Sequence, residues 1–388
     1  MNGRVFLSVA DDEDIMTSTG RSDDFIAGGY IVEHGSLEPC TVVCSDGKVS
    51  IDYSLPDRCD FNAIFIKDMV NAHTHCGDYG LKVPEGLSIE ELVAPPNGLK
   101  HRYLSGLDED GLRENMLRFD KASANFGSAS FIDFREGGVA GCRMLRSCSK
   151  DAIILGRPIS KEYDPEEVHE ILSVADGIGI PSISDIEGDY LEAVADDVRR
   201  ARKIFAIHVS ERVREDIDTV LSLDPAFVVH MCEATDDDMA KCAEAEVPIA
   251  VCPSSNAYFG KETPVVRMME NGADVMLGTD NGMLCEPDLI SEASVFASLV
   301  SKQGGDPGTM WTALSGISGK LLNRTSRMEY EIQEHYLTVV PQRGRDEVAA
   351  LAPFRIDMNR GVCIDGIQKD PGTDRRKRIH QASDQAGN

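Results

Sequence analysis

Short apolar runs alternate with longer amphipathic stretches from residue 64 onward, and this alternation dominates the pattern of the chain. Each run has three to seven residues, a length that suits a strand buried on both faces of a parallel sheet. The runs are Ile64–Val70, Ser128–Phe134, Ala152–Leu155, Ile178–Ile183, Ile204–Ile207, Ala226–Val229, Ile249–Val251 and Val275–Leu277. They predict eight parallel strands.

The stretches that follow the runs have helical length and spacing. The predicted helices are Glu109–Ser123, Pro165–Ala175, Tyr190–Arg202, Thr235–Ala245, Pro264–Asn271 and, after the last strand, Pro287–Val300. Eight strand–helix repeats match a (β/α)8 barrel of the TIM type better than an open doubly wound sheet, which would tend to carry a glycine-rich phosphate loop. The chain has neither a G-x-G-x-x-G motif nor a P-loop. We therefore predict an α/β fold built on this barrel.

The chain before the barrel follows a different pattern. Short strand-like stretches between residues 25 and 60 are separated by turn residues. We expect a small β-sandwich element over 1–62 and the barrel over 63–325. A segment over 326–370 is expected to return strands to the β element, although its pattern is weak. The polar residues 371–388 predict a disordered tail.

Charge and composition exclude several classes of partner. The 39 basic and 66 acidic residues give a formal charge of −27, which opposes binding to nucleic acid and to anionic membranes. No apolar run approaches the length of a transmembrane helix, and the N-terminus lacks the pattern of a signal peptide. The 11 cysteines are dispersed and form no C-x-x-C pair. We expect a cytoplasmic enzyme with a small-molecule substrate, and its oligomeric state stays open.

Polar residues at the ends of the eight runs are the candidates for chemistry, because barrel enzymes carry their sites at the C-terminal ends of the strands. His73 and His75 follow the first run and are two residues apart, so on an extended chain both face the same way, as two ligands of one metal must. Histidines and a carboxylate also follow the fifth, sixth and eighth runs, at His208, His230 and Asp280. Imidazole with one carboxylate suits zinc or iron better than magnesium or calcium.

Five motifs, in this order, carry a family resemblance: HTH at 73–75, IHVSE at 207–211, VVHMCEAT around His230, CPSSNAYFG at 252–260 and LGTDN at 277–281. Together they resemble the amidohydrolase superfamily, in its cytosine deaminase, S-adenosylhomocysteine deaminase and chlorohydrolase branch. The resemblance covers roughly residues 25–325.

The resemblance implies a role for each matching residue. His73, His75, His208 and Asp280 would bind one divalent transition metal, zinc or iron. His230 would contact the hydrolytic water or the substrate, Glu211 would shuttle protons, and Asp280 would accept the proton of the water. Relatives with two metals carry a lysine at the end of the fourth strand, and GIGIPSISDIEG at 177–188 contains none. The sequence therefore favours a single metal.

The predicted activity is hydrolysis of a non-peptide C–N bond, with removal of the amino group of a purine, pyrimidine, pterin or related ring as the leading hypothesis. Hydrolytic opening of a cyclic amide or amidine on the same site is the alternative within the enzyme class. A non-catalytic barrel used for assembly is the alternative outside it. That third hypothesis would predict lost ligands, and all of them are in place.

The remaining polar residues at the strand ends are candidates for substrate binding. Arg135, Glu136, Arg157 and Asn256 are predicted to contact substrate, although an Arg135–Glu136 ion pair and a bracing role for Asn256 are alternatives. The basic triplet at 100–102 lies in the long loop after the first strand. We expect it to be a solvated surface cluster, with a lid over the site as the alternative.

Overall fold

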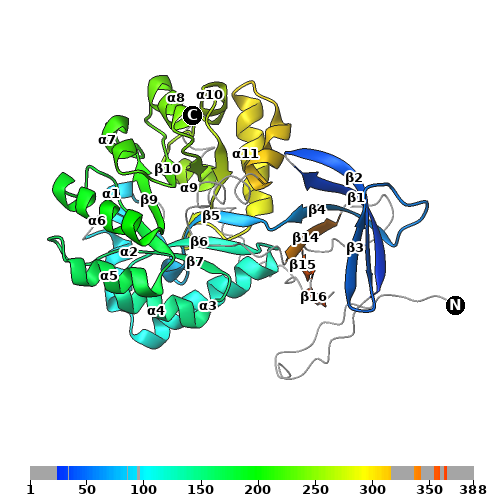
Figure 1. Cartoon of the computed structure of the whole chain (residues 1–388), viewed down its shortest axis with the longest axis horizontal. Coiled ribbons are helices and arrows are strands. Elements are labelled where there is room, and N and C mark those ends of the chain that lie inside the picture. The colour runs from blue at the N-terminus through cyan, green and yellow to red at the C-terminus, as the bar shows by residue number, and fades with distance from the viewer. Residues whose placement is uncertain are drawn as a thin grey trace.

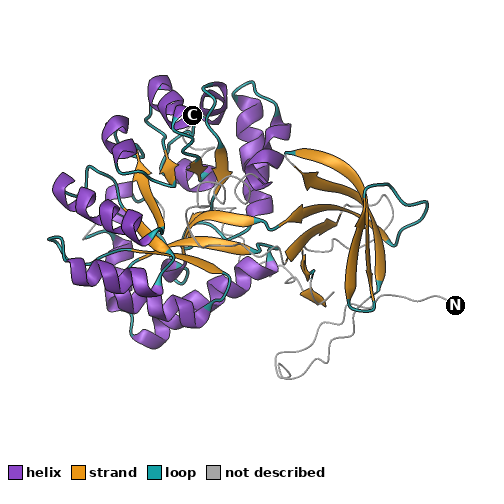
Figure 2. Ribbon diagram, viewed as in Figure 1, coloured by secondary structure: helices purple, strands orange, loops and turns teal. Residues whose placement is uncertain are grey.

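The computed structural model describes residues 24–315 except 34, 85 and 94–96, together with 336–341, 354–358 and 362–364. These residues form two sheets: a larger one surrounded by helices and a smaller one at its side (Figures 1 and 2). The predicted disordered tail lies outside the described residues.

The larger sheet is a closed barrel of parallel strands. Its strand order is β12-β11-β10-β9-β8-β7-β6-β5-β13, and β12 and β13 are two parts of one segment at 275–281. Since β13 pairs with β5, the two ends of the sheet meet. The strands are β5 (Val70–His75), β6 (Ser130–Arg135), β7 (Ala152–Gly156), β8 (Gly177–Ile180), β9 (Ile204–Val209), β10 (Phe227–His230), β11 (Ile249–Val251), β12 (Val275–Leu277) and β13 (Asp280–Asn281). The predicted barrel is confirmed.

The smaller sheet combines strands from both ends of the described chain in the order β16-β15-β14-β4-β1-β2-β3. As expected, C-terminal strands return to the N-terminal element, where β14 pairs antiparallel with β4. The strands are β1 (Phe25–Glu33), β2 (Ser36–Ser45), β3 (Lys48–Asp52), β4 (Phe61–Lys67), β14 (Tyr336–Pro341), β15 (Phe354–Asp357) and β16 (Val362–Ile364).

The first apolar run is divided between the two sheets, so Ile64–Val70 is not the first barrel strand. Most of it belongs to β4, which also crosses the boundary predicted between residues 62 and 63. The chain breaks at Asp68, whose φ of 43° is left-handed, and the barrel begins with β5. His73 and His75 therefore lie within the first barrel strand. An apolar run cannot show where a chain leaves one buried sheet for another, because both give the same pattern.

Helices cover the outside of the barrel (Figure 1). The six predicted helices are present, with ends within two residues of the prediction. Helix α4 was missed because glycines at its start argue against a helix, yet a side chain at Gly141 would collide with the carbonyl of Glu136. The helices are α1 (Ile89–Leu92), α2 (Leu99–Gly106), α3 (Glu109–Asn125), α4 (Gly138–Cys148), α5 (Pro165–Val174), α6 (Gly188–Ala201), α7 (Ile217–Ser222), α8 (Asp236–Glu244), α9 (Pro253–Tyr258), α10 (Val265–Glu270), α11 (Leu289–Lys302) and the 3-10 turns η1 (Cys76–Asp78) and η2 (Pro307–Thr309).

Two apolar cores hold the barrel. Inward-facing side chains such as Ile132, Phe134 and Phe227 fill its interior, and a larger core lies between the strands and the helices. Phe134 packs against Gly179 on β8, where any side chain would collide with its ring. The filled interior means that the barrel is a scaffold, with its chemistry confined to one end.

The segment between β5 and α3, which we call the excursion, carries α1 and α2. Ile89, Val93 and Lys100 from this excursion line a cavity at the C-terminal ends of the strands. The excursion therefore forms one wall of the cavity. None of the helices within the described residues has both the length and the apolar character needed to cross a bilayer.

Candidate metal centre

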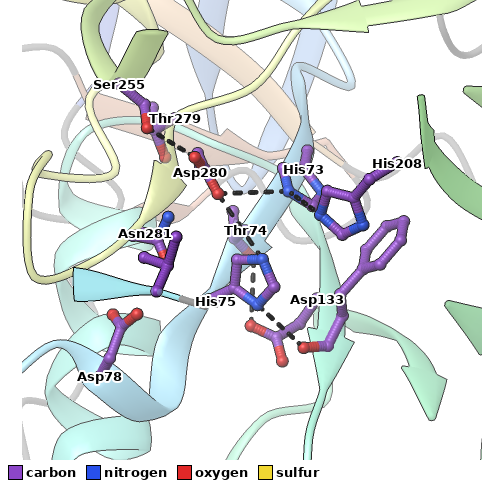
Figure 3. A network of polar contacts seen from close by, with 12 residues as sticks. His73, Thr74, His75, Asp78, Asp133, His208, Ser255, Thr279, Asp280 and Asn281 are labelled. Atoms are coloured by element: carbon purple, nitrogen blue, oxygen red, sulfur yellow. Dashed lines mark hydrogen bonds and ion pairs between the residues drawn. The ribbon is translucent and has the colours of Figure 1, made fainter. Parts of the chain in front are cut away.

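Residues from four of the five motifs lie close together in Figure 3: His73, His75, His208, Ser255 and Asp280. His73 and His75 lie on β5, His208 on β9, and Asp280 begins β13 beside β5. His75, His208 and Asp280 line the cavity, whereas His73 is completely buried beneath it. Segments that are far apart in the sequence thus place four donor groups around one point.

Three of the distances between donor atoms suit ligands of one metal ion. Nε2 of His73 lies 3.2 Å from Nε2 of His208 and 3.2 Å from Oδ1 of Asp280, and Nε2 of His75 lies 3.6 Å from the same oxygen. Tetrahedral bonds of roughly 2.0–2.2 Å, as zinc forms with nitrogen and oxygen, hold neighbouring ligand atoms about 3.3–3.6 Å apart. Two overlapping groups of residues could hold such an ion, His73–His75–His208 and His73–His230–Asp280, so the site fits a divalent transition metal.

Backbone carbonyls set the tautomers of two of these histidines. Nδ1 of His208 lies 2.9 Å from the carbonyl oxygen of Ile180, and Nδ1 of His75 lies 3.2 Å from that of Phe134. A carbonyl can only accept, so Nδ1 carries the proton and Nε2 presents its lone pair to the site. This is the arrangement that a metal ligand requires. Nδ1 of His73 has no hydrogen-bond partner among the described residues.

The electrostatics of the group favour a cation at its centre. Burial lowers the pKa of His73 to about 3 against the opposing effect of Asp280, and burial also lowers the pKa of His208 far below its usual value. Burial acts to raise the pKa of Asp280, but its contact with His73 outweighs this and keeps that pKa well below the ordinary range. Neutral imidazoles beside a buried carboxylate leave a negative charge that a divalent ion would neutralise.

The backbone at the strand ends adopts uncommon conformations. His230 has a φ of 76° and Asp280 a φ of 59°, in the left-handed region that costs about 1–3 kcal/mol for residues other than glycine. Between β12 and β13, a side chain at Gly278 would lie only 2.8 Å from the backbone nitrogen of His73. The glycine of the LGTDN motif therefore allows the last strand to approach the first.

Helix α9, which begins at the proline of the CPSSN motif, carries residues that support the site. The hydroxyl of Ser255 donates to Oδ2 of Asp280 at 2.5 Å, leaving Oδ1 to face the histidines. The side-chain amide of Asn256 donates to Nδ1 of His230 at 3.1 Å, and Thr263 donates to the amide oxygen of Asn256. Asn256 is fully buried and lies outside the cavity lining, so the predicted substrate contact gives way to the bracing alternative.

His230 differs from the other histidines in its hydrogen bonding. Because Nδ1 accepts from Asn256, the neutral ring carries its proton on Nε2. That nitrogen lies 3.7 Å from Oε1 of Glu211, and both residues line the cavity. His230 thus presents a donor to the cavity, where His75 and His208 present lone pairs.

Glu211 is a partly buried carboxyl group at the cavity wall. Burial raises its pKa above the ordinary value, with His230 acting in the opposite direction. A carboxyl group with a raised pKa holds its proton more readily near neutral pH, as a general acid must.

The predicted substrate residue Arg135 lies below the cavity rather than in its lining. Its guanidinium group is 1% exposed, pairs with Glu136 and Asp133, and donates to Sγ of Cys76. The structure therefore supports the ion-pair alternative for Arg135. Glu136 does line the cavity, but its carboxylate also contacts Lys100 at 2.9 Å and Nδ1 of His75 at 3.2 Å.

Lys100 contradicts the expectation of a solvated basic cluster. Its side chain is 5% exposed, and Nζ lies 2.9 Å from Glu136, 3.0 Å from Oδ1 of Asn281 and 3.6 Å from Asp78. The ammonium group joins the excursion to the ends of β6 and β13. No local pattern in the sequence indicates this burial, because a Lys-His-Arg triplet in a loop is usually solvated.

No protein-family model matches the chain, but individual proteins resemble it in sequence and in fold. A protein of Archaeoglobus fulgidus with the name "Putative aminohydrolase" is 32% identical over 280 residues, covering 72% of this chain and 81% of the relative. A protein of Methanothermobacter thermautotrophicus with the same name is 34% identical over 298 residues, covering 69% and 78%.

Among solved structures, a zinc-bound adenosine deaminase from Xanthomonas campestris superimposes with a TM-score of 0.66. It covers 93% of this chain and 98% of its own, at 16% identity. At that identity the likeness concerns the fold, which is a barrel of the same kind.

Proposed function

Because the chain belongs to the amidohydrolase superfamily, we propose that it removes an amino group from an aminated heterocycle by hydrolysis. The names of the relatives point to release of an amine from carbon. The reaction adds water to an amidine-like carbon, forms a carbonyl group and releases ammonia, so it needs neither oxidant nor reductant.

In this proposal His73, His75, His208 and Asp280 hold one zinc ion. The distances and tautomers described above support this set, and the zinc found in the adenosine deaminase of similar fold supports zinc over iron. A bound divalent ion lowers the pKa of a water molecule from 15.7 toward ~7, which makes a nucleophile available at neutral pH. The absence of a lysine from residues 177–188 supports a single ion.

His230 serves as a hydrogen-bond donor rather than a ligand. The amide of Asn256 keeps the proton on Nε2, and that N–H faces the cavity beside Glu211. From there it can orient the attacking water or stabilise negative charge as it develops on oxygen.

Glu211 and Asp280 divide the proton transfers. Asp280, ionised and fixed through Oδ2 by Ser255, accepts a proton from the water. Glu211 donates a proton to a ring nitrogen of the substrate, takes up the proton of the added hydroxyl group as the carbonyl forms, and passes that proton to the departing amine. The proton held by Asp280 then restores Glu211. Its raised pKa suits this acid role and is the observation that favours deamination over reactions with a leaving group that needs no proton.

Convergence of the four donor atoms carries the proposal, and the test is metal analysis followed by an ammonia-release screen over aminated purines, pyrimidines and pterins. We expect one zinc ion per chain and ammonia release from at least one ring class. Protein that binds no transition metal would overturn the proposal. Metal without ammonia release would point instead to ring opening of a cyclic amide or amidine.

A further inference from the structure

One cation in the cavity wall lacks the partner that its neighbours have. Lys100 pairs with Glu136 at 2.9 Å, and Arg212 pairs with Asp185 at 2.8 Å. Arg157 also lines the cavity, but no carboxylate of the described residues lies within 4.0 Å of its guanidinium group. Glu136 and Asp185 are thus paired with other cations, and among the described residues Arg157 has no carboxylate partner of its own.

The backbone fixes Arg157 in this position. It is the first residue after β7, and its backbone N–H donates to the carbonyl oxygen of Arg135 at 2.9 Å, which continues the β6–β7 pairing. The side chain is mostly buried. Burial lowers its pKa, while Glu136 and Asp185 act in the opposite direction from beyond pairing distance.

A purely structural arginine would show a different environment. Arg135, one strand away, is enclosed by Asp133, Glu136 and Cys76, and Arg146 pairs with Asp176 at 2.6 Å. A desolvated cation without such partners costs stability unless a ligand supplies the missing charge. Its position in the cavity lining makes the substrate the natural source of that charge.

The topology places Arg157 at one side of the metal centre. In the barrel order, β7 is two strands from β5 and two from β9, the strands that carry the three histidine ligands. Two strand spacings correspond to roughly 10 Å. If the reacting carbon lies over the metal ligands, a substrate group that binds Arg157 therefore points from the ring toward β7.

We propose that Arg157 binds an oxyanion on the substrate, so that the heterocycle carries a carboxylate or phosphate group as well as the amino group that is removed. The guanidinium fork matches the two oxygens of either group. With one uncompensated cation and Glu136 and Asp185 nearby, the wall suits a single negative charge better than a double one. The inference rests on the proposed function, because it assumes that the heterocycle lies over the metal centre.

Equilibrium binding to the zinc-loaded protein tests this inference with matched pairs of deaminated rings, which cannot turn over. The pairs are uracil with uracil-6-carboxylate, lumazine with 6-carboxylumazine, and inosine with inosine 5′-monophosphate. We expect at least one anionic member to bind about 10- to 100-fold more tightly than its neutral partner, as a charge-assisted hydrogen bond would give. Which pairs respond distinguishes a carboxylate from a phosphate.

Substitutions then locate the preference. Arg157→Gln should reduce the difference in affinity between the anionic and the neutral ring to within about twofold. Arg212→Gln removes a paired charge from the same wall and should retain the full difference. Arg157→Lys keeps the positive charge but lacks the paired N–H donors of the guanidinium group, so it should give an intermediate preference for the anionic ring. It replaces Arg157→Gln as the test if that variant does not fold.

Two results would overturn the inference: no anionic preference in any pair, including the case in which nothing binds, or a preference that persists in Arg157→Gln. Ammonia release from the corresponding neutral amines without an anionic preference would retain the proposed function and reject this site. An anionic preference in zinc-loaded protein that releases no ammonia would retain this anion site and reject the proposed function.

Discussion

The Nε2 atoms of His73 and His208 face each other at 3.2 Å, although 135 residues separate them in the chain. Two imidazole nitrogens held this close inside a protein suit a shared cation, since both rings are neutral and Asp280 completes the group.

Acidification should release the metal. The pKa of His73 is lowered to about 3 from 6.5, so His73 favours the folded, neutral-ring state above pH 6.5. That contribution is lost as the pH falls from about 6.5 toward 3, where protons compete with the metal for the ring nitrogens. Metal content after dialysis at stepped pH should therefore fall across this window. Full retention at pH 3 would contradict the histidine ligands.

Glu211→Gln should lower the rate of ammonia release by about 10²–10⁴-fold, because glutamine cannot give up a proton to the ring or to the leaving amine. Metal content should not change, since Glu211 is not in the ligand set. Glu233→Gln, a neighbouring acid that pairs with Lys261, is the matched control and should retain activity. A Glu211→Gln protein with wild-type kcat would exclude the shuttle role.

Ser255→Ala should weaken metal binding about 10- to 100-fold, as expected when the group that orients a ligand is removed. The hydroxyl of Ser255 fixes Oδ2 of Asp280, whereas that of Ser254 donates to Glu292. Ser254→Ala is therefore the control, and competition with a chelator gives both affinities. Equal affinities in the two variants would show that the hydrogen bond to Asp280 has no effect on the metal.

Lys100→Met should destabilise the metal-loaded protein by about 3–5 kcal/mol, because it leaves Asp78 buried without its cation and removes one of the two cations that Glu136 contacts. Burial already raises the pKa of Asp78 to about 6 despite Lys100. Denaturant unfolding measures the loss. The exposed ion pair of Lys241 provides the control, and Lys241→Met should change stability little. Adding Glu136→Gln to Lys100→Met should recover part of the loss.

The sequence predicted the barrel and six residues at its strand ends, because periodicity and chain order carry that information. These residues are His73, His75, His208, Glu211, His230 and Asp280. It could not distinguish Arg135 from Arg157, since both lie within two residues of the end of a strand-like run and only packing shows that Arg135 lies below the cavity. It also missed Lys100, because the burial of that side chain depends on how the excursion folds back. Pairings such as Ser255 with Asp280 need the three-dimensional structure, since nothing in the local sequence encodes them.

The most direct test of the central claim is a zinc titration of metal-stripped protein with ammonia release as the readout, using the ring class found in the screen. A single ion held by His73, His75, His208 and Asp280 predicts no activity without metal, and activity that rises in proportion to bound zinc and saturates at one ion per chain. Ammonia release by fully stripped protein, or saturation only at two ions, would contradict it.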